Sequence, residues 1–218
     1  MHFRDRRHAG QVLTESLLHY AGRDDVIVLA LPRGGVPVGF EVTKKLGAPL
    51  DVFIVRKLGS PGHEELAMGA IASGGILVLN DDVVQSLRVS RQEIEQAAAR
   101  ELLELERRER LFRGDRAAPN LEGRVVILVD DGLATGSTMR AAVAAVRTQK
   151  PSRIVVAVPT GAPETCEEFR QDVDEVVCPS TPDYFRAVGM WYDDFTQTED
   201  REVRSILEAA GAGTKIDV

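Results

Sequence analysis

The stretch VVILVDDGLATGST, residues 125–138, constrains the fold of this chain more than any other. Its first five residues are apolar and mostly β-branched, which is typical of a strand buried on both faces of a sheet. Two adjacent carboxylates follow, and then small and hydroxyl residues lead into an alanine-rich segment that predicts a helix. A strand, a loop of small residues and a helix start together predict an anion site, because backbone N–H groups can surround the anion there.

Further apolar runs predict the rest of a sheet. Strand, helix and strand follow one another between residues 26 and 56, and such a βαβ unit implies a parallel sheet. A second series begins at residue 125. We therefore predict an α/β fold with a mainly parallel sheet flanked by helices. The expected strands are 26–31, 50–56, 125–129, 153–159 and 174–178.

Residues 57–122 interrupt this alternation and form an insertion. It contains a pattern that predicts a hairpin through 68–80, and a charged helix that begins after Ser90 with Glu93 completing a capping box. Arginines and glutamates alternate along this helix, which predicts either a solvated face with ion pairs or a basic end that closes over an anionic ligand. We expect one domain over 1–218, with a C-terminal hood and helix region at 179–210 and a frayed end at 211–218.

Composition excludes some classes of function. A net charge of −7 argues against broad, nonspecific nucleic-acid binding. The spacing of Cys166 and Cys178 matches no metal-site pattern and predicts two reduced thiols. The first residues lack the apolar stretch of a signal peptide, and no run reaches the roughly 20 apolar residues of a membrane helix. We expect a cytoplasmic protein without a membrane or nucleic-acid partner.

The loop after residue 129 does not match three familiar nucleotide motifs. A P-loop lysine is missing, no G-x-G-x-x-G follows the first strand, and the two aspartates are adjacent instead of separated by one residue. Small residues and hydroxyls suit a phosphate monoester, while two carboxylates can accept hydrogen bonds from vicinal hydroxyls or face a metal ion or a developing cation. A ribose 5-phosphate carries both groups, because it has a phosphate and, close to it, a pair of vicinal hydroxyls. The alternative is a tight turn with a capping aspartate.

Residues 125–138 resemble the phosphoribosyl-pyrophosphate signature of the type I phosphoribosyltransferases. The resemblance implies the fold of that family. It also implies that Asp130 and Asp131 hold the ribose hydroxyls and serve as the catalytic carboxylates. The 5-phosphate would be bound by the loop residues Gly132, Ala134, Thr135, Gly136, Ser137 and Thr138.

Two further segments resemble the same family. The turn LPRGG is similar to its pyrophosphate loop, so Arg33 and Gly34 would contact the diphosphate; the alternative is an ordinary Pro-Gly turn. The end of the 50–56 strand resembles a strand end that carries pyrophosphate-binding cations, here Arg56 and Lys57, although two surface cations are the alternative. A mobile loop follows this strand in the family, whereas here the longer insertion follows.

Five of the eleven aromatic residues fall between 184 and 195. They predict either a wall on which a planar base stacks or apolar packing of the last helix. The segment AVGMWYDDF is similar to the base-binding segment of hypoxanthine-guanine members, which implies that Asp193 helps to hold the metal-diphosphate. The family's stacking aromatic is replaced by Arg186, so Phe185 or Trp191 would take its place.

The resemblance implies a transferase that uses phosphoribosyl pyrophosphate and Mg²⁺. It would transfer the phosphoribosyl group to a nucleobase-like acceptor, with a purine as one option, and release pyrophosphate. Family analogy also implies a homodimer. The alternative hypothesis is a non-catalytic regulatory or sensor protein that binds phosphoribosyl pyrophosphate or a nucleotide. A third option is an acceptor that is not a nucleobase.

Overall fold

The centre of the molecule is a five-stranded, fully parallel sheet with the strand order β2-β1-β6-β7-β8. The computed structural model describes residues 1–114 and 116–213. The predicted α/β class and mainly parallel sheet are confirmed. The strands are β1 (Val26–Ala30), β2 (Leu50–Val52), β6 (Val125–Val129), β7 (Arg153–Ala157) and β8 (Glu175–Val177).

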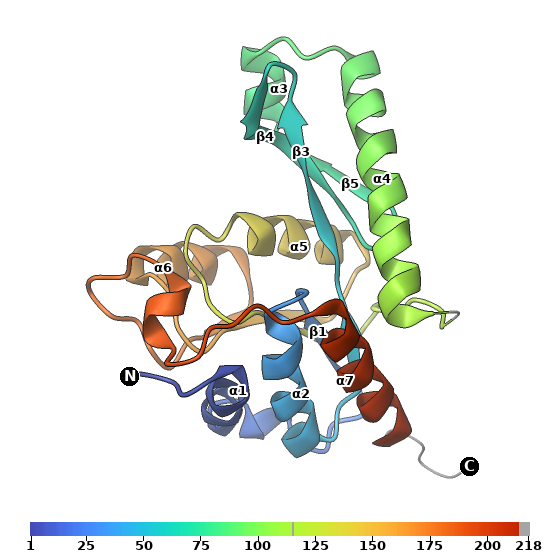
Figure 1. Ribbon diagram of the computed structural model, residues 1–218. Helices are drawn as coiled ribbons and strands as arrows, with labels where there is room; N and C mark the ends of the chain where they lie inside the picture. The colour runs from blue at the N-terminus through green and yellow to red at the C-terminus, as the bar shows by residue number, and fades with distance from the viewer. Residues whose placement is uncertain (115, 214–218) are drawn as a thin grey trace.

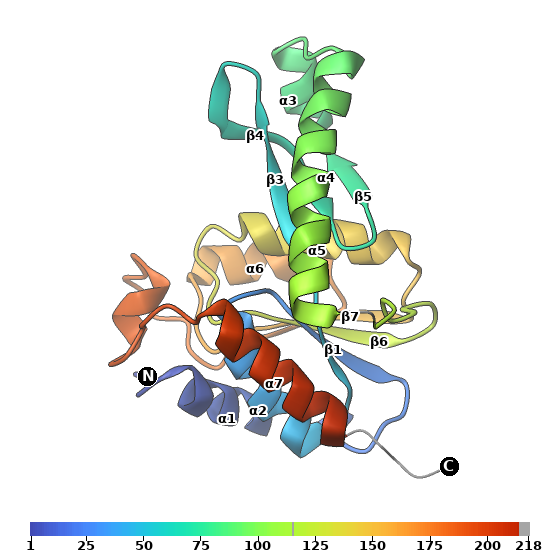
Figure 2. The ribbon, with the colours of Figure 1, turned by 45° about the vertical axis from the view of Figure 1, so that its right-hand side comes forward.

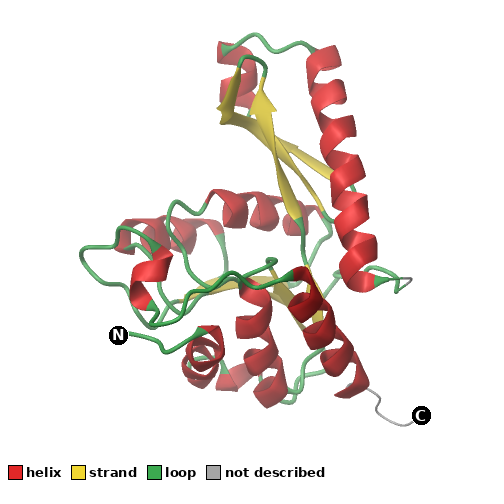
Figure 3. Ribbon diagram, viewed as in Figure 1, coloured by secondary structure: helices red, strands yellow, loops and turns green. Residues whose placement is uncertain are grey.

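Helices cover both faces of this sheet (Figures 1 and 3). All five residues of β1 and of β6 are buried, and successive side chains point into two different cores. One core is closed by α1 (Arg6–Glu15), α2 (Gly35–Leu46) and α7 (Asp200–Gly213), and the other by α5 (Ser137–Thr148) and α6 (Pro163–Asp172). Burial on both faces explains why the strands are continuous apolar runs.

The remaining part of the fold, which we call the arm, consists of residues 55–113 and projects from the sheet and its helices (Figures 1 and 2). Its antiparallel sheet has the order β3-β4-β5. The predicted hairpin is confirmed as β4–β5, and the predicted helix begins after Ser90 with the expected capping box. The elements of the arm are β3 (Val55–Ser60), β4 (His63–Ala72), β5 (Ile76–Leu79), α3 (Asp81–Ser86) and α4 (Arg91–Arg113).

The prediction of one strand over 50–56 is wrong. The parallel strand β2 ends at Val52, and the chain then enters the arm, where Arg56 pairs with Ile71 in antiparallel register. The transition is fixed by Ser73, whose Oγ accepts a hydrogen bond from the Ile54 amide at 2.9 Å and whose own amide donates to the Ile54 carbonyl at 2.8 Å. Arg56 and Lys57 therefore lie on the arm and not at the end of a parallel strand.

Short helical turns complete the chain. A 3₁₀ turn, η1 (Leu18–Tyr20), follows α1, and another, η2 (Val188–Trp191), lies in the segment before α7. The predicted fraying of 211–218 does not apply to Gly211, which belongs to α7; residues 214–218 lie outside the described part of the chain. No helix among the described residues is long and apolar enough to cross a membrane.

A buried arginine fastens the arm to the parallel sheet. Arg113, at the end of α4, is only 6% exposed, and its Nε donates to the Asp51 carboxylate of β2 at 3.1 Å. Its Nη2 donates to the Val52 carbonyl at 3.1 Å, and its Nη1 lies 3.3 Å from Glu109. Each of the three guanidinium nitrogens of Arg113 thus has an acceptor, and such additional hydrogen bonds are the condition under which a buried ion pair is stable.

Replacing this arginine should destabilise the protein. We expect Arg113→Ala to lower the free energy of unfolding by about 3–5 kcal/mol, because the Asp51 carboxylate then remains buried without its cation. Urea denaturation measures the change. Arg110→Ala is the matched control, since Arg110 is exposed on the same helix and its loss should cost less than about 0.5 kcal/mol. Equal stability of the two variants would contradict this role for Arg113.

Candidate functional site

Asp130 and Asp131, which we call the acidic pair, lie at the point of the sheet where the strand order changes direction. From β1 the chain continues to β2 on one side, whereas from β6 it continues to β7 on the other. The helices that follow β1 and β6, α2 and α5, therefore cover opposite faces of the sheet, and we call the place between their N-termini, at the carboxyl ends of these two strands, the crevice. Open α/β sheets bind their ligands at this position. Asp130 and Asp131 follow β6 directly and so stand at this crevice.

The loop after β1 packs against the acidic pair, and this contact requires glycine. A β-carbon on Gly34 would lie 2.0 Å from Oδ2 of Asp131, and one on Gly35 would lie 2.5 Å from the Val129 carbonyl oxygen. The Leu31 amide also donates to that carbonyl at 2.8 Å. The structure thus brings together three of the predicted site segments: Arg33–Gly34, Asp130–Asp131 and the start of the small-residue loop.

The small-residue loop turns into α5 at Gly136. This glycine has a φ of +72°, and a β-carbon on it would lie 2.6 Å from the Phe169 ring. The Ala134 carbonyl accepts a hydrogen bond from the Thr165 hydroxyl at 2.7 Å, which ties the loop to α6.

The hydroxyl side chains of this loop remain accessible. Thr135, Ser137 and Thr138 are exposed, and the Oγ atoms of Thr135 and Ser137 lie 3.2 Å apart. The first turn of α5 begins in the same place, and anions often bind at helix N-termini because the first N–H groups of a helix have no partner within the helix. Gly132 is packed against Val188 of η2, where a β-carbon would lie 2.4 Å from a methyl group.

The two carboxylates have different surroundings. Burial raises the pKa of Asp130 well above the ordinary value, and the neighbouring Asp131 carboxylate raises it further. Burial also raises the pKa of Asp131, whereas the charge and hydrogen bond of Arg6 lower it. The Nε of Arg6 donates to Oδ2 of Asp131 at 2.8 Å, and the Tyr192 hydroxyl donates to the Asp131 carbonyl at 2.5 Å. Sequence reasoning missed both Arg6 and Tyr192.

Two of the predicted cations, Arg33 and Arg56, are paired with carboxylates. Arg33 lies 3.5 Å from Asp200 at the start of α7. Arg56 lies on β3 and donates to Glu101 of α4, with Nη2 at 2.7 Å and Nε at 2.8 Å. Lys57 follows it on the arm, in register with Ala70.

The C-terminal aromatic residues divide into two groups. Phe185 and Trp191 stack with ring centroids 6.3 Å apart and ring planes 15° apart. Tyr192 packs against Phe3 and Phe195 and so joins this segment to the N-terminus. The buried Nε1 of Trp191 has no hydrogen-bond partner among the described residues.

Asp193, predicted as a metal ligand, has a side chain that is 68% exposed and lies 3.1 Å from His2. Within residues 1–114 and 116–213, no three His, Cys, Asp or Glu side chains are grouped closely enough to hold a metal ion by themselves. A metal in this crevice would therefore need oxygen atoms from a ligand as well as those of the acidic pair.

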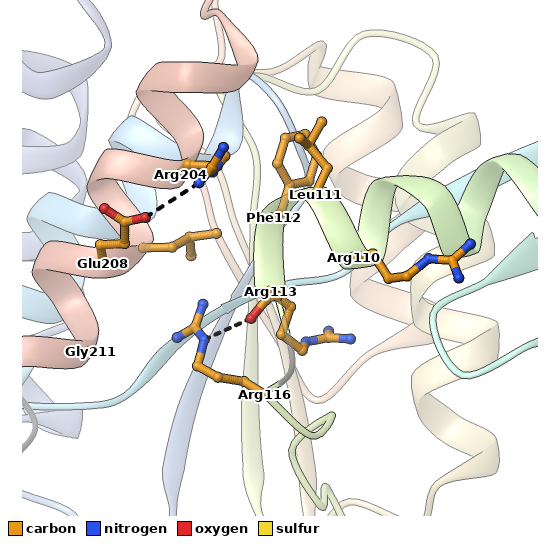
Figure 4. A pocket seen from close by; sticks show the side chains of 10 residues that line it. Arg110, Leu111, Phe112, Arg113, Arg116, Arg204, Glu208 and Gly211 are labelled. Atoms are coloured by element: carbon orange, nitrogen blue, oxygen red, sulfur yellow. Dashed lines mark hydrogen bonds and ion pairs between the residues drawn. The ribbon is translucent and has the colours of Figure 1, made fainter.

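A cavity of about 580 Å³ lies away from the crevice, between the end of α4 and α7 (Figure 4). Its wall includes Arg110, Arg116 and Arg204. Arg110 points away from α7 in this view, whereas the Nε of Arg116 donates to the Arg113 carbonyl and Arg204 lies 3.9 Å from Glu208. These arginines do not converge on one point, so the cavity is not a better candidate than the crevice.

Comparison with known proteins identifies relatives of the chain. Residues 6–194 match the family model described as "Phosphoribosyl transferase domain". A Mycobacterium tuberculosis H37Rv protein named "Putative phosphoribosyl transferase Rv0571c" is 47% identical over 208 residues, which are 95% of this chain and 47% of the relative. Its counterpart in strain CDC 1551 matches equally well. The chain thus spans about half the length of these curated relatives.

A solved structure is also similar over almost its whole length. The crystal structure of TT1426 from Thermus thermophilus has a TM-score of 0.84 and 46% sequence identity, and the match covers 95% of this chain and 98% of that one. The arrangement of sheet, helices and arm described above is therefore shared with a known protein.

The raised pKa of Asp130 predicts a pH-dependent cost to stability. Since the folded protein binds the proton of Asp130 more tightly than the unfolded chain, stability should fall as the pH rises through the folded pKa. We expect Asp130→Asn to be more stable than the wild type at pH 8, by about 1–2 kcal/mol, with a difference that shrinks toward pH 4. Urea denaturation at several pH values measures this, with the exposed Asp24→Asn as the control. A variant less stable than the wild type at pH 8 would contradict the burial of this charge.

Proposed function

Because this chain belongs to the family of the phosphoribosyl transferase domain, we propose that it is an enzyme that uses phosphoribosyl pyrophosphate. It would transfer the phosphoribosyl group to a nucleobase-like acceptor and release pyrophosphate. One observation carries the proposal: the adjacent carboxylates Asp130 and Asp131 stand at the crevice, against a glycine loop and just before a helix N-terminus with accessible hydroxyls. A ribose with a phosphate at one end suits this arrangement.

In the proposed complex, different segments of the crevice bind different parts of the ligand. The hydroxyls of Thr135, Ser137 and Thr138 and the first N–H groups of α5 bind the 5-phosphate. Asp130 and Asp131 accept hydrogen bonds from the ribose hydroxyls. The loop at Arg33–Gly34, which touches Asp131, lies beside the pyrophosphate.

A magnesium ion fits this proposal. Mg²⁺ is commonly held by one or two carboxylates together with substrate phosphates, so it needs no larger group of protein ligands. Asp130 and Asp131 are the side chains that would share it with the ligand, and Asp193 is the further ligand that the family resemblance implies. When bound, the ion would neutralise charge on the departing pyrophosphate.

The chemistry follows from the charges of the crevice. The bond from ribose C1 to pyrophosphate breaks, positive charge develops at the ribose, and a ring nitrogen of the acceptor forms the new bond. Asp131, whose pKa Arg6 lowers against the effect of burial, is the carboxylate that binds hydroxyls. Asp130 has the more strongly raised pKa, and it is the better group to take up the proton that the acceptor loses.

The acceptor would be planar. The stacked rings of Phe185 and Trp191 lie in the same segment as Val188, which packs against Gly132 of the small-residue loop. Stacking on such rings favours a flat heterocycle such as a nucleobase. Stacking of this kind does not favour a purine over any other base.

A binding protein without turnover is the second candidate, and the pairing of the cations favours it. Arg56 is held by Glu101, and Arg33 faces Asp200, so neither guanidinium group is reserved for a leaving pyrophosphate. A sensor needs only the phosphate loop and the acidic pair. The enzyme, in contrast, requires these cations to exchange their carboxylate partners for the pyrophosphate.

Calorimetric titration with phosphoribosyl pyrophosphate and Mg²⁺ tests the proposal. We expect the wild type and the exposed control Asp24→Asn to bind, and Asp131→Asn to bind at least 10-fold more weakly, because two charge-assisted hydrogen bonds are lost. Omitting Mg²⁺ should weaken binding to the wild type as well.

Pyrophosphate release, measured over a panel of bases, separates the two candidates. Release that one base stimulates, and that Asp131→Asn lowers by 10²-fold or more, supports the enzyme. Binding without release under every base favours the sensor. Absence of binding by the wild type would overturn both.

A further inference from the structure

Arg6 links three distant parts of the chain at the crevice. It is the first residue of α1, after Asp5, whose carboxylate caps the helix by accepting from the His8 amide. The Arg6 guanidinium donates through Nε to Asp131 at 2.8 Å and through Nη1 to the Thr196 carbonyl at 2.7 Å.

The position of this guanidinium group is restricted on its remaining sides. Its Cζ lies 4.0 Å from the centroid of the Phe195 ring, which is close enough for a cation–π interaction. The side chains of Arg6 and Asp131 are only 11% and 13% exposed. A pair so well removed from water is screened far less by salt than the ion pairs on the surface of α4.

The same contact determines where the Asp131 carboxylate lies. Oδ2 is held between the Arg6 Nε and the backbone of Gly34, where even a methyl group would not fit. The carboxylate is therefore fixed before any ligand arrives, and fixed hydrogen-bonding groups bind a ligand with less loss of entropy.

We propose that Arg6 is a positioning residue: it holds the Asp131 carboxylate in the orientation in which that carboxylate accepts hydrogen bonds from the ligand's hydroxyls, and it connects the carboxylate to the segment around Phe195 and Thr196. This inference rests on the proposed function. It assigns a role in the site to the first helix, which carries none of the residues of the phosphate signature.

The test uses Arg6→Gln and Arg6→Lys, with Arg7→Gln as the matched control. Arg7 is the next residue of α1, is 51% exposed and lies 3.7 Å from Glu41. We expect Arg6→Gln to weaken binding of phosphoribosyl pyrophosphate about 10- to 100-fold, and Arg7→Gln to leave it unchanged. Arg6→Lys should restore part of the affinity, because lysine keeps the charge and loses the planar fork.

Thermal unfolding shows whether each variant is folded, and Arg6→Lys alone tests the proposal if Arg6→Gln does not fold. Partial rescue by Arg6→Lys supports a role of the charge at Asp131 and not of helix α1 alone. Affinity that stays unchanged in Arg6→Gln, or that falls equally in Arg7→Gln, overturns the role of Arg6. Failure of the wild type to bind overturns the proposed function instead.

Discussion

The approach of the Pro32–Gly35 loop to the acidic pair is the contact on which the rest of the site depends. The strand order places the carboxyl ends of β1 and β6 side by side, so the two loops must share one edge of the sheet. They can do so only because Gly34 and Gly35 have no β-carbon. With the loops in contact, α2 and α5 begin next to the same crevice, so that a ligand bound by one loop would lie within reach of the other.

This contact has a cost in electrostatic free energy. Two adjacent carboxylates are drawn away from water, which raises the pKa of both, and one arginine from α1 offsets part of the repulsion. The anchor of the arm uses the same physics differently, because both oxygens of the buried Asp51 carboxylate accept hydrogen bonds from the buried Arg113.

The sequence was sufficient for features that are determined locally. Apolar runs predicted the parallel strands, Ser90 and Glu93 predicted the start of α4, and residues 125–138 predicted the strand, loop and helix at the crevice. The prediction of one strand over 50–56 was wrong for a physical reason. Its residues favour a β conformation throughout, and only the hydrogen bonds to Ser73 mark where the chain leaves one sheet for another.

Partners of charged groups could not be read from local patterns, because they are chosen by the tertiary fold. Arg6 and Asp131 are 125 positions apart, and Tyr192 reaches Asp131 from 61 positions away. The same holds for Arg56, which the arm pairs with Glu101. If a pyrophosphate is to bind Arg33 and Arg56, it must displace Asp200 of α7 and Glu101 of α4. Binding of the leaving group would then be coupled to α7 and to the arm, since both supply the carboxylates that compete with it.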